Sequence, residues 1–323
     1  MDLSIFFAGT GGSIPTTRRG LPAILVRRGA DRILFDCGEG TQRQLVSSVG
    51  LADMTDIFLT HFHADHWLGL PGMLKTFDLR GRERPLTIHG PAGAGALLAL
   101  VLRMAGNTGY ELSAVELEPG DVVRRDGYMI APVPVSHRGP ALAYVLYEDE
   151  RRGVFDPAAA ERLGLVPGPE FGRVMRGETV RGVTPDQVMG PTRTGRKLLL
   201  SGDTRPCDAL RIAAHRADVL VHEATFAQEE VQRADDSGHS TAQQAATIAR
   251  EAEVTLLALN HTSTRHPLRQ LRDEARAVFP TTVVPRDFDT IDIPLPERGE
   301  PQLIRWDERM AAEPAEAAPA STP

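Results

Sequence analysis

Short apolar runs, bounded by glycine, proline and charged residues, recur along most of the chain. Runs of this length and punctuation are typical of buried strands. We predict strands at residues 3–8, 22–27, 32–36, 56–60, 86–89, within 121–135, and at 141–147, 198–200, 218–223, 254–259 and 281–284. Longer stretches with helical periodicity predict helices at about 41–49, 71–78, 92–104, 241–252 and 268–278, with Ser240 as the N-cap before Thr241.

Several of these strands end in a side chain that can bind a metal ion. The runs before His61, His222 and His261 share one form, a polar start followed by apolar residues and then the ligand-type residue. Residues 34–38 and 199–203 also resemble each other, and each precedes a helix. Open α/β sheets place their sites at the carboxyl ends of strands. We therefore predict an α/β fold, a four-layer αββα sandwich, with a site at one edge.

The pattern is interrupted after Glu148. From there to Lys197 the chain has little apolar periodicity, and glycine and proline are concentrated at 164–169. A connection of this length inside a compact domain needs a reason. It is either an inserted flexible arm, at about 150–197, or a disordered loop, and we favour the arm. We predict one domain over residues 1–310 that carries this arm, and a disordered Ala/Glu/Pro-rich tail at 311–323.

The charge is unevenly distributed. The formal net charge of the 323 residues is −7, which gives no overall support for a nucleic-acid partner. Residues 161–197, however, hold seven basic and four acidic side chains, which leaves +3 there and −10 elsewhere. The predicted arm could therefore hold an RNA backbone, although a solvated loop would have the same composition.

Composition also indicates the cell compartment. Two cysteines, Cys37 and Cys207, are too few for a disulfide framework and are interpreted as reduced thiols of a cytoplasmic protein. The start lacks a basic region before its apolar run, so we interpret it as a first strand rather than a signal peptide. No apolar segment approaches the roughly 20 residues of a membrane span, so we expect no membrane partner.

The highest density of side chains that can bind a metal ion lies directly after the apolar run at 57–59. Three histidines and one aspartate fall within six positions, where imidazole and carboxylate groups suit Zn²⁺: His61, His63, Asp65 and His66. A polar loop that happens to hold histidines is the alternative. Four ligands are too few for two ions, and ligand-type residues at later strand ends complete the set: His137, Asp203 and His261. Each of these three alone could be a structural residue.

The seven residues divide into two groups. We predict that one ion is held by His61, His63 and His137, the other by Asp65, His66 and His261, and that Asp203 and a water bridge them. Two ions about 3.5–4 Å apart suit in-line displacement at phosphorus. Asp65 is the candidate general base, or the group that orients the nucleophile.

A leaving alkoxide benefits from a proton donor, and His222 and His239 both lie outside the metal set. A neighbouring carboxylate raises the pKa of a histidine and fixes its tautomer. We predict His239 as the general acid, oriented by Glu223; the alternative is that both histidines are polar loop residues. The glycine-rich loop at 9–15 either presents backbone amides to an anion or is a tight turn between strands.

Together these motifs resemble the ribonuclease Z family of the metallo-β-lactamase superfamily, over about residues 1–295. The superfamily pattern is the segment 61–66, here called the metal loop, together with His137, Asp203 and His261. Narrower similarities are the opening at 7–15, the continuation at 67–72, the Gly/Pro insertion, and the sequences Ser201-Gly202-Asp203-Thr204, His222-Glu223-Ala224-Thr225-Phe226 and His239-Ser240-Thr241. The chain departs from the family pattern at Ala64, where glycine is frequent, and at Asn260, where threonine is common.

The resemblance implies a zinc-dependent endoribonuclease that removes the 3′ trailer of precursor tRNA after the discriminator base and leaves a 3′-hydroxyl. It implies two Zn²⁺ per chain, with Mn²⁺ or another divalent ion as the alternative, bound by the seven residues named above. Asp65 would accept a proton, and His239 would support protonation of the leaving group. The short form of the family acts as a homodimer, and its arm grips the tRNA. The arm of this chain is rich in arginine but has only one lysine, Lys197.

Other functions use the same scaffold. A general phosphodiesterase or an exoribonuclease would need the same metal site. A thioester or lactone hydrolase would use the same ligands, but it would have no use for the basic arm or for the pair of His239 and Glu223. A non-catalytic RNA-binding relative would be expected to have lost ligands, whereas all seven positions are filled here.

Overall fold

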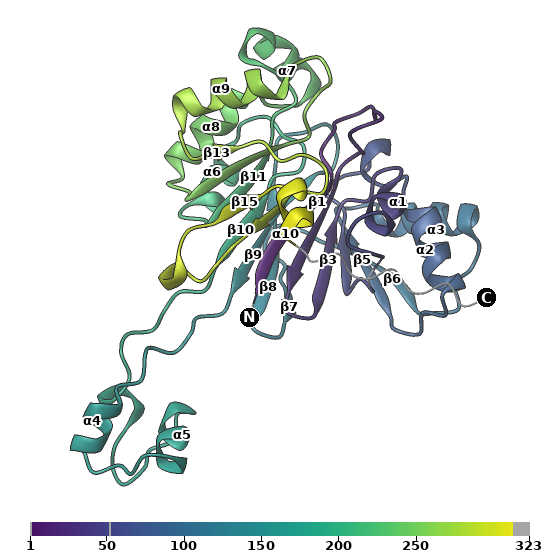
Figure 1. The fold of residues 1–323 in the computed structure, drawn as a ribbon. Coiled ribbons are helices and arrows are strands. Elements are labelled where there is room, and N and C mark those ends of the chain that lie inside the picture. The colour runs from purple at the N-terminus through teal and green to yellow at the C-terminus, as the bar shows by residue number, and fades with distance from the viewer. Residues whose placement is uncertain (1, 52, 313–323) are drawn as a thin grey trace.

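Two β-sheets pack face to face in the computed structural model, which describes residues 2–51 and 53–312. The first sheet has the strand order β15-β14-β1-β2-β3-β4-β5-β6, and the second has the order β13-β12-β11-β10-β9-β8-β7. Helices cover the outer face of each sheet (Figure 1). The chain therefore forms the predicted four-layer αββα sandwich.

The first sheet contributes apolar side chains to a core on each of its faces. Its strands are β1 (Leu3–Gly9), β2 (Ala23–Arg28), β3 (Asp31–Phe35), β4 (Asp56–Phe58), β5 (Leu86–Gly90), β6 (Leu112–Glu116), β14 (Thr290–Asp292) and β15 (Gln302–Ile304). Because side chains alternate along a strand, Ile5 faces the other sheet and Phe6 faces the helices. The helices on this side are α1 (Thr41–Val46), α2 (Leu70–Leu79), α3 (Ala94–Ala105) and α10 (Trp306–Ala312).

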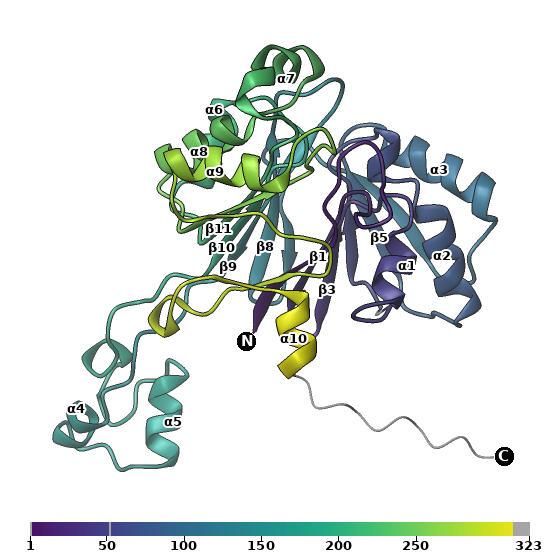
Figure 2. The ribbon, with the colours of Figure 1, turned by 45° about the horizontal axis from the view of Figure 1, so that its top comes forward.

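The second sheet carries the other half of the core. Its strands are β7 (Val123–Arg125), β8 (Tyr128–Pro134), β9 (Leu142–Glu148), β10 (Lys197–Leu200), β11 (Val219–Glu223), β12 (Leu256–Asn260) and β13 (Thr282–Val283). On its outer face lie α6 (Asp208–Ala214), α8 (Ala242–Glu251) and α9 (Leu268–Val278). Helix α8 buries four alanines, whose small side chains let its backbone approach the sheet closely. A further helix, α7 (Val231–Ser237), lies at one end (Figure 2).

Most predicted elements are present, with ends that differ by a few residues, but the N-cap of α8 was wrong. Thr241, not Ser240, caps the helix: its hydroxyl accepts from the Gln244 amide at 3.2 Å, and the Gln244 side chain accepts from the Thr241 amide at 2.9 Å. This reciprocal pair is a capping box. The Ser240 hydroxyl instead donates to the carbonyl of Thr204.

The stretch between β9 and β10 projects from the sandwich as an arm (Figures 1 and 2). It contains α4 (Pro157–Arg162), α5 (Pro169–Met175) and a short 3₁₀ turn (Pro185–Gln187), none of which the sequence pattern predicted. Six buried apolar side chains form a small core of its own: Ala160, Leu165, Val174, Val180, Val183 and Val188. Where the arm joins the sandwich, the backbone amides of Arg151 and Arg193 donate to each other's carbonyls at 2.7 and 2.8 Å.

Helix α10 changes the predicted boundary of the tail. Residues 311 and 312, which were assigned to a disordered tail, continue this helix, and the rest of that prediction lies outside the described residues. Over residues 2–51 and 53–312, none of the helices combines the length and the apolar character that crossing a membrane requires.

Candidate metal centre

The metal loop leaves a strand that is buried in the middle of the first sheet. Strand β4 runs parallel to β3 and β5, and the chain then passes through a 3₁₀ turn (Ala64–His66). His61 and His66 are each 1% exposed, whereas His63 is exposed. His137 follows β8, Asp203 follows β10 and His261 follows β12, so these side chains reach the same edge of the sandwich from the second sheet.

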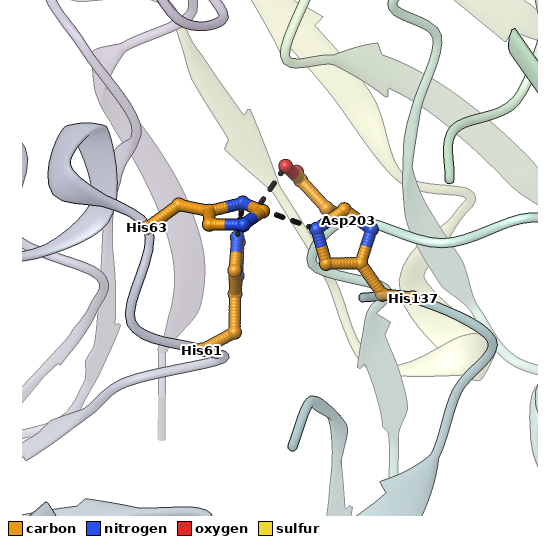
Figure 3. A group of neighbouring side chains, drawn as sticks. All are labelled: His61, His63, His137 and Asp203. Carbon is orange, nitrogen blue, oxygen red and sulfur yellow. Dashed lines mark hydrogen bonds and ion pairs between the residues drawn. The ribbon is translucent and has the colours of Figure 1, made fainter. Parts of the chain in front are cut away.

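One group contains His61, His63, His137 and Asp203. Their side chains point toward one another (Figure 3), and one ligand atom from each lies within 4.8 Å of every other. His63 Nδ1 lies 3.0 Å from His61 Nε2 and 3.2 Å from His137 Nε2. Asp203 Oδ2 is 3.6 Å from His61 Nε2.

The second group contains Asp65, His66 and His261. The two Nε2 atoms of His66 and His261 are 3.3 Å apart, and Asp65 Oδ2 is 3.4 Å from His261 Nε2. Asp203 Oδ2 lies 3.4 Å from each of these two Nε2 atoms, as well as beside the first group. The structure thus brings all seven predicted residues together and places Asp203 between the two groups, where the sequence analysis put the bridging carboxylate.

This donor set fits divalent ions. Two nitrogens bound to one tetrahedral zinc at about 2.0–2.1 Å lie about 3.4 Å apart, which agrees with the spacings above. The Oδ1 atom of Asp203 is buried and has no hydrogen-bond partner within the described chain. Burial, reinforced by the neighbouring His66, lowers the pKa of His61 and favours the neutral imidazole that a metal ligand requires.

A second layer of side chains orients the imidazoles. Nδ1 of His66 donates to Asp36 Oδ2 at 2.8 Å, and Asp36 Oδ1 also accepts from the Thr60 amide at 2.8 Å. Nδ1 of His137 donates to the carbonyl of Gly238 at 2.7 Å. Because each Nδ1 is occupied in this way, the Nε2 atoms present their lone pairs to the cluster.

His239 and Glu223 adjoin the two metal groups, and His239 also forms a third group of possible ligands with Asp203 and His261. Glu223, at the end of β11, is 2% exposed, and its Oε1 accepts from His239 Nδ1 at 2.8 Å. Burial opposes a charge on His239, but the carboxylates of Glu223 and Asp203 outweigh it and raise the pKa of His239 to about 9. A buried carboxylate thus holds the His239 ring and favours its protonated form. His222 is different: its Nδ1 bonds the carbonyl of Glu223, and its ring is fully buried away from the cluster.

The glycine-rich loop packs against the second metal group. The Ser13 amide donates to Asp65 Oδ2 at 2.8 Å, so the anion that this loop faces is a carboxylate of the protein itself. A Cβ added at Gly12 would lie 2.7 Å from the His261 ring. The glycine at this position therefore lets the loop lie directly on a candidate ligand.

Comparisons with known proteins agree with this geometry. The model of the metallo-beta-lactamase superfamily matches residues 17–261. A ribonuclease Z of Methanosarcina acetivorans is 41% identical over 300 residues, covering 90% of this chain and 98% of the relative. That of Gemmatimonas aurantiaca is 43% identical over 307 residues, covering 92% and 98%. The chain belongs to the ribonuclease Z family. Among solved structures, human tRNase Z, short form, is similar to this ribonuclease Z family member with a TM-score of 0.67 and 26% identity, covering 90% of this chain and 99% of that one.

Sequence reasoning missed the second layer of this ribonuclease Z site. Asp36 was part of a strand-to-helix turn in the prediction, and its φ of 57° agrees with such a turn, but its contact with His66 was not foreseen. Thr225 was quoted only as part of a motif, yet its hydroxyl is 2.9 Å from His261 Nδ1. The one sequence feature that pointed to a role for Asp36 in the site is its position directly after a buried strand, which it shares with the metal loop.

Proposed function

We propose that this ribonuclease Z family member is a metal-dependent endoribonuclease that removes the 3′ trailer of precursor tRNA, cutting after the discriminator base and leaving a 3′-hydroxyl. The observation that carries the proposal is similarity to ribonuclease Z over 90–92% of a chain that keeps all seven ligand-type residues in one cluster. We further propose that the cluster holds two Zn²⁺, with Mn²⁺ as the alternative, and that the protein acts in the cytoplasm.

The proposed roles follow from the donor set. His61, His63 and His137 would hold one ion, Asp65, His66 and His261 the other, and Asp203 would contact both. Bound divalent ions would supply Lewis acidity at the scissile phosphate and neutralise charge on its oxygens. These assignments are supported by the spacings within the cluster and by the hydrogen bonds of His66 and His137, which engage Nδ1 and leave Nε2 facing the other members of the cluster.

The chain's own groups would handle the protons. Burial opposes a charge on Asp65, but the hydrogen bond from His261 and the nearby imidazoles hold the pKa of Asp65 below its ordinary value. An ionised Asp65 can accept a hydrogen bond from the attacking water and direct it at phosphorus. His239 would donate a proton to the leaving O3′ of the discriminator nucleotide, which becomes the 3′-hydroxyl of the tRNA, and Glu223 would hold the ring in place.

The arm is the proposed contact for the body of the tRNA. Several of its arginines are already paired with acids, such as Arg173 with Glu178 and Arg181 with Glu170. Both arginines are exposed, and surface ion pairs contribute about 0–1 kcal/mol, so a phosphate can replace the carboxylate at little cost. The small core of α4 and α5 would keep the arginines in a fixed arrangement.

One experiment tests the nuclease and the arm together. Residues 152–192 are replaced by a two-residue turn that joins Arg151 to Arg193, whose backbones already pair. We expect cleavage of a precursor tRNA with a 3′ trailer to fall by about 100-fold or more in kcat/KM, while hydrolysis of bis(p-nitrophenyl) phosphate stays within about threefold. Asp65→Ala should abolish both activities. An equal loss of both activities in the arm deletion would contradict the role of the arm.

We also propose that the protein is a homodimer. Leu100 and Met104 are exposed large apolar side chains four residues apart on α3, so they lie on one face of that helix. Neighbouring exposed apolar residues often mark an association surface. Sedimentation velocity over a range of concentrations should give a dimer mass. Leu100→Glu with Met104→Glu should shift it toward the monomer, and a monomer mass for the unmodified chain at all concentrations would refute the proposal.

A further inference from the structure

The arm joins the sandwich through two chain segments, one that follows β9 and one that precedes β10 (Figures 1 and 2). Within residues 2–51 and 53–312, the hydrogen bonds and ion pairs of residues 152–192 are to one another or to Arg193. A two-stranded ribbon is only marginally stable by itself. The direction in which the arm projects therefore depends on contacts at its root, residues 148–151 and 193–197.

One carboxylate of the sandwich contacts both segments of the root. Glu297 lies in a 3₁₀ turn (Pro296–Arg298) between β14 and β15. Its Oε1 accepts from Arg151 Nη1 at 2.6 Å and from Arg193 Nη1 at 2.8 Å, and its Oε2 accepts from Arg151 Nη2 at 2.9 Å. Arg151 follows β9 and Arg193 precedes β10, so Glu297 ties the outgoing segment and the returning segment to the same point.

The turn that carries Glu297 is itself held on the sandwich. Strand β14, which precedes the turn, pairs with β1, and β15, which follows it, pairs with β14. Between β14 and the turn, the amide of the buried Ile293 donates to the Leu3 carbonyl at 2.9 Å, and the Ile293 carbonyl accepts from Arg196 Nη1 at 2.6 Å. Glu297 is thus a fixed point on the body of the protein.

The geometry distinguishes this contact from an isolated surface ion pair. The side chains of Arg151, Arg193 and Glu297 are 24%, 37% and 39% exposed. Isolated exposed pairs contribute little, but bidentate arginine–carboxylate pairs and networks of several charges are the exceptions. The hydrogen bonds from Arg151 lower the pKa of Glu297 to about 2, so the carboxylate is ionised at neutral pH and both arginines keep their anionic partner.

We propose that Glu297 is a positioning residue for precursor tRNA: it clamps both segments of the root and so holds the arm in the direction that tRNA binding requires. This inference rests on the proposed function of the arm. An element that is already held in its bound orientation loses less conformational freedom on binding, which strengthens binding. Release of the clamp should therefore weaken tRNA binding and leave the reaction at the metal groups unchanged.

Electrostatics alone predicts the opposite sign for a change at Glu297. A carboxylate repels the phosphate backbone, and its removal would also free two arginines for RNA, so binding would become tighter without a positioning role. Glu297→Gln removes the charge and keeps the size of the side chain. Glu300→Gln is the matched control, because Glu300 is an exposed acid of the same segment and forms no hydrogen bond or ion pair with the described residues.

The test compares the two variants with the unmodified, metal-loaded protein. In Glu297→Gln we expect hydrogen exchange of the paired Arg151 and Arg193 amides to become about threefold faster or more, in the absence of RNA. The KM for precursor tRNA and the Kd for mature tRNA should rise by about 3–10-fold. The kcat for precursor tRNA and the hydrolysis of bis(p-nitrophenyl) phosphate should stay within about twofold, which also shows that the variant is folded.

The outcomes separate this inference from the proposed function. Unchanged exchange at the root, an unchanged or lower Kd for tRNA, or an equal effect of Glu300→Gln refutes the positioning role of Glu297. A lack of precursor cleavage by the unmodified protein contradicts the proposed nuclease instead, and the exchange rates and the Kd for mature tRNA then still decide whether Glu297 positions the arm.

Discussion

Replacing Asp36 by asparagine tests whether a single carboxylate sets the tautomer of a metal-ligating histidine. Asp36 is 6% exposed and accepts from His66 Nδ1 and from both the amide and the hydroxyl of Thr60. In Asp36→Asn the amide oxygen can still accept from the Thr60 amide. The side-chain NH₂ then faces His66 Nδ1, which forces the proton onto Nε2, the atom that points into the cluster.

The expected cost can be worked from this contact. A metal-ligating histidine usually donates a hydrogen bond from the ring nitrogen that does not bind the metal. Loss of the group that accepts this bond typically reduces metal affinity or activity by 10–100-fold, or about 1.4–2.7 kcal/mol. The assay is a metal titration against a competing chelator, followed by cleavage of precursor tRNA at increasing metal concentration. We expect weak metal binding by Asp36→Asn and recovery of part of the cleavage when metal is in excess.

A matched control separates this effect from general loss of stability. Asp56→Asn changes another buried carboxylate that accepts from a buried histidine, His89, at 2.9 Å, but this pair is not part of either metal group. It should lower the melting temperature and leave metal affinity unchanged. If Asp36→Asn binds metal within twofold of the unmodified protein, or if Asp56→Asn loses metal equally, the tautomer argument is wrong.

Three further predictions concern the proton donor, the glycine loop and the root of the arm. His239→Asn should lower cleavage by about 10²–10⁴-fold with unchanged metal content, and loss of metal would show that the ring is a ligand instead. Gly12→Ala should weaken metal binding, because its Cβ would meet His261 at 2.7 Å; unchanged binding would contradict this. Glu148 is buried between Arg28 and Arg196, and its removal in Glu148→Ala should cost about 3–5 kcal/mol in the free energy of unfolding. Burial opposes a charge on Glu148, but these arginines hold its pKa below 4.5, so its contribution is present above pH 4.5 and is lost as pH falls through the folded pKa. Acid titration of Glu148→Gln should show a smaller loss of stability.

The metal site was predictable because two kinds of information agreed. The spacing from His61 to His66 is dense enough to indicate a metal loop without any structure. His137, Asp203 and His261 each follow an apolar run, and the carboxyl ends of such strands converge. The structure brings these residues within a few ångströms of one another, and their role as ligands stays a prediction for metal analysis.

The arm itself was predicted, but its internal structure and the second layer were not predictable from the same signals. The arm's core consists of six small or branched residues, spaced from 160 to 188 without a helical or strand period, so the sequence pattern predicted an inserted arm but none of its helices. Asp36 contacts His66 because β3 and β4 are parallel neighbours, with Phe35 opposite Phe58. That register depends on packing of the whole sheet, and it is not visible in the local sequence of either turn.

Thr225 shows how this second layer could link metal binding to proton transfer. Its hydroxyl donates to Glu223 Oε2 at 2.8 Å and is therefore left to accept from His261 Nδ1 at 2.9 Å. The other oxygen of Glu223 holds His239. One buried carboxylate thus orients both a candidate ligand and the candidate proton donor. Changes at Glu223 should consequently affect metal affinity and leaving-group protonation together, whereas changes at His239 should affect only the second, and this difference distinguishes a shared positioning residue from one that serves His239 alone.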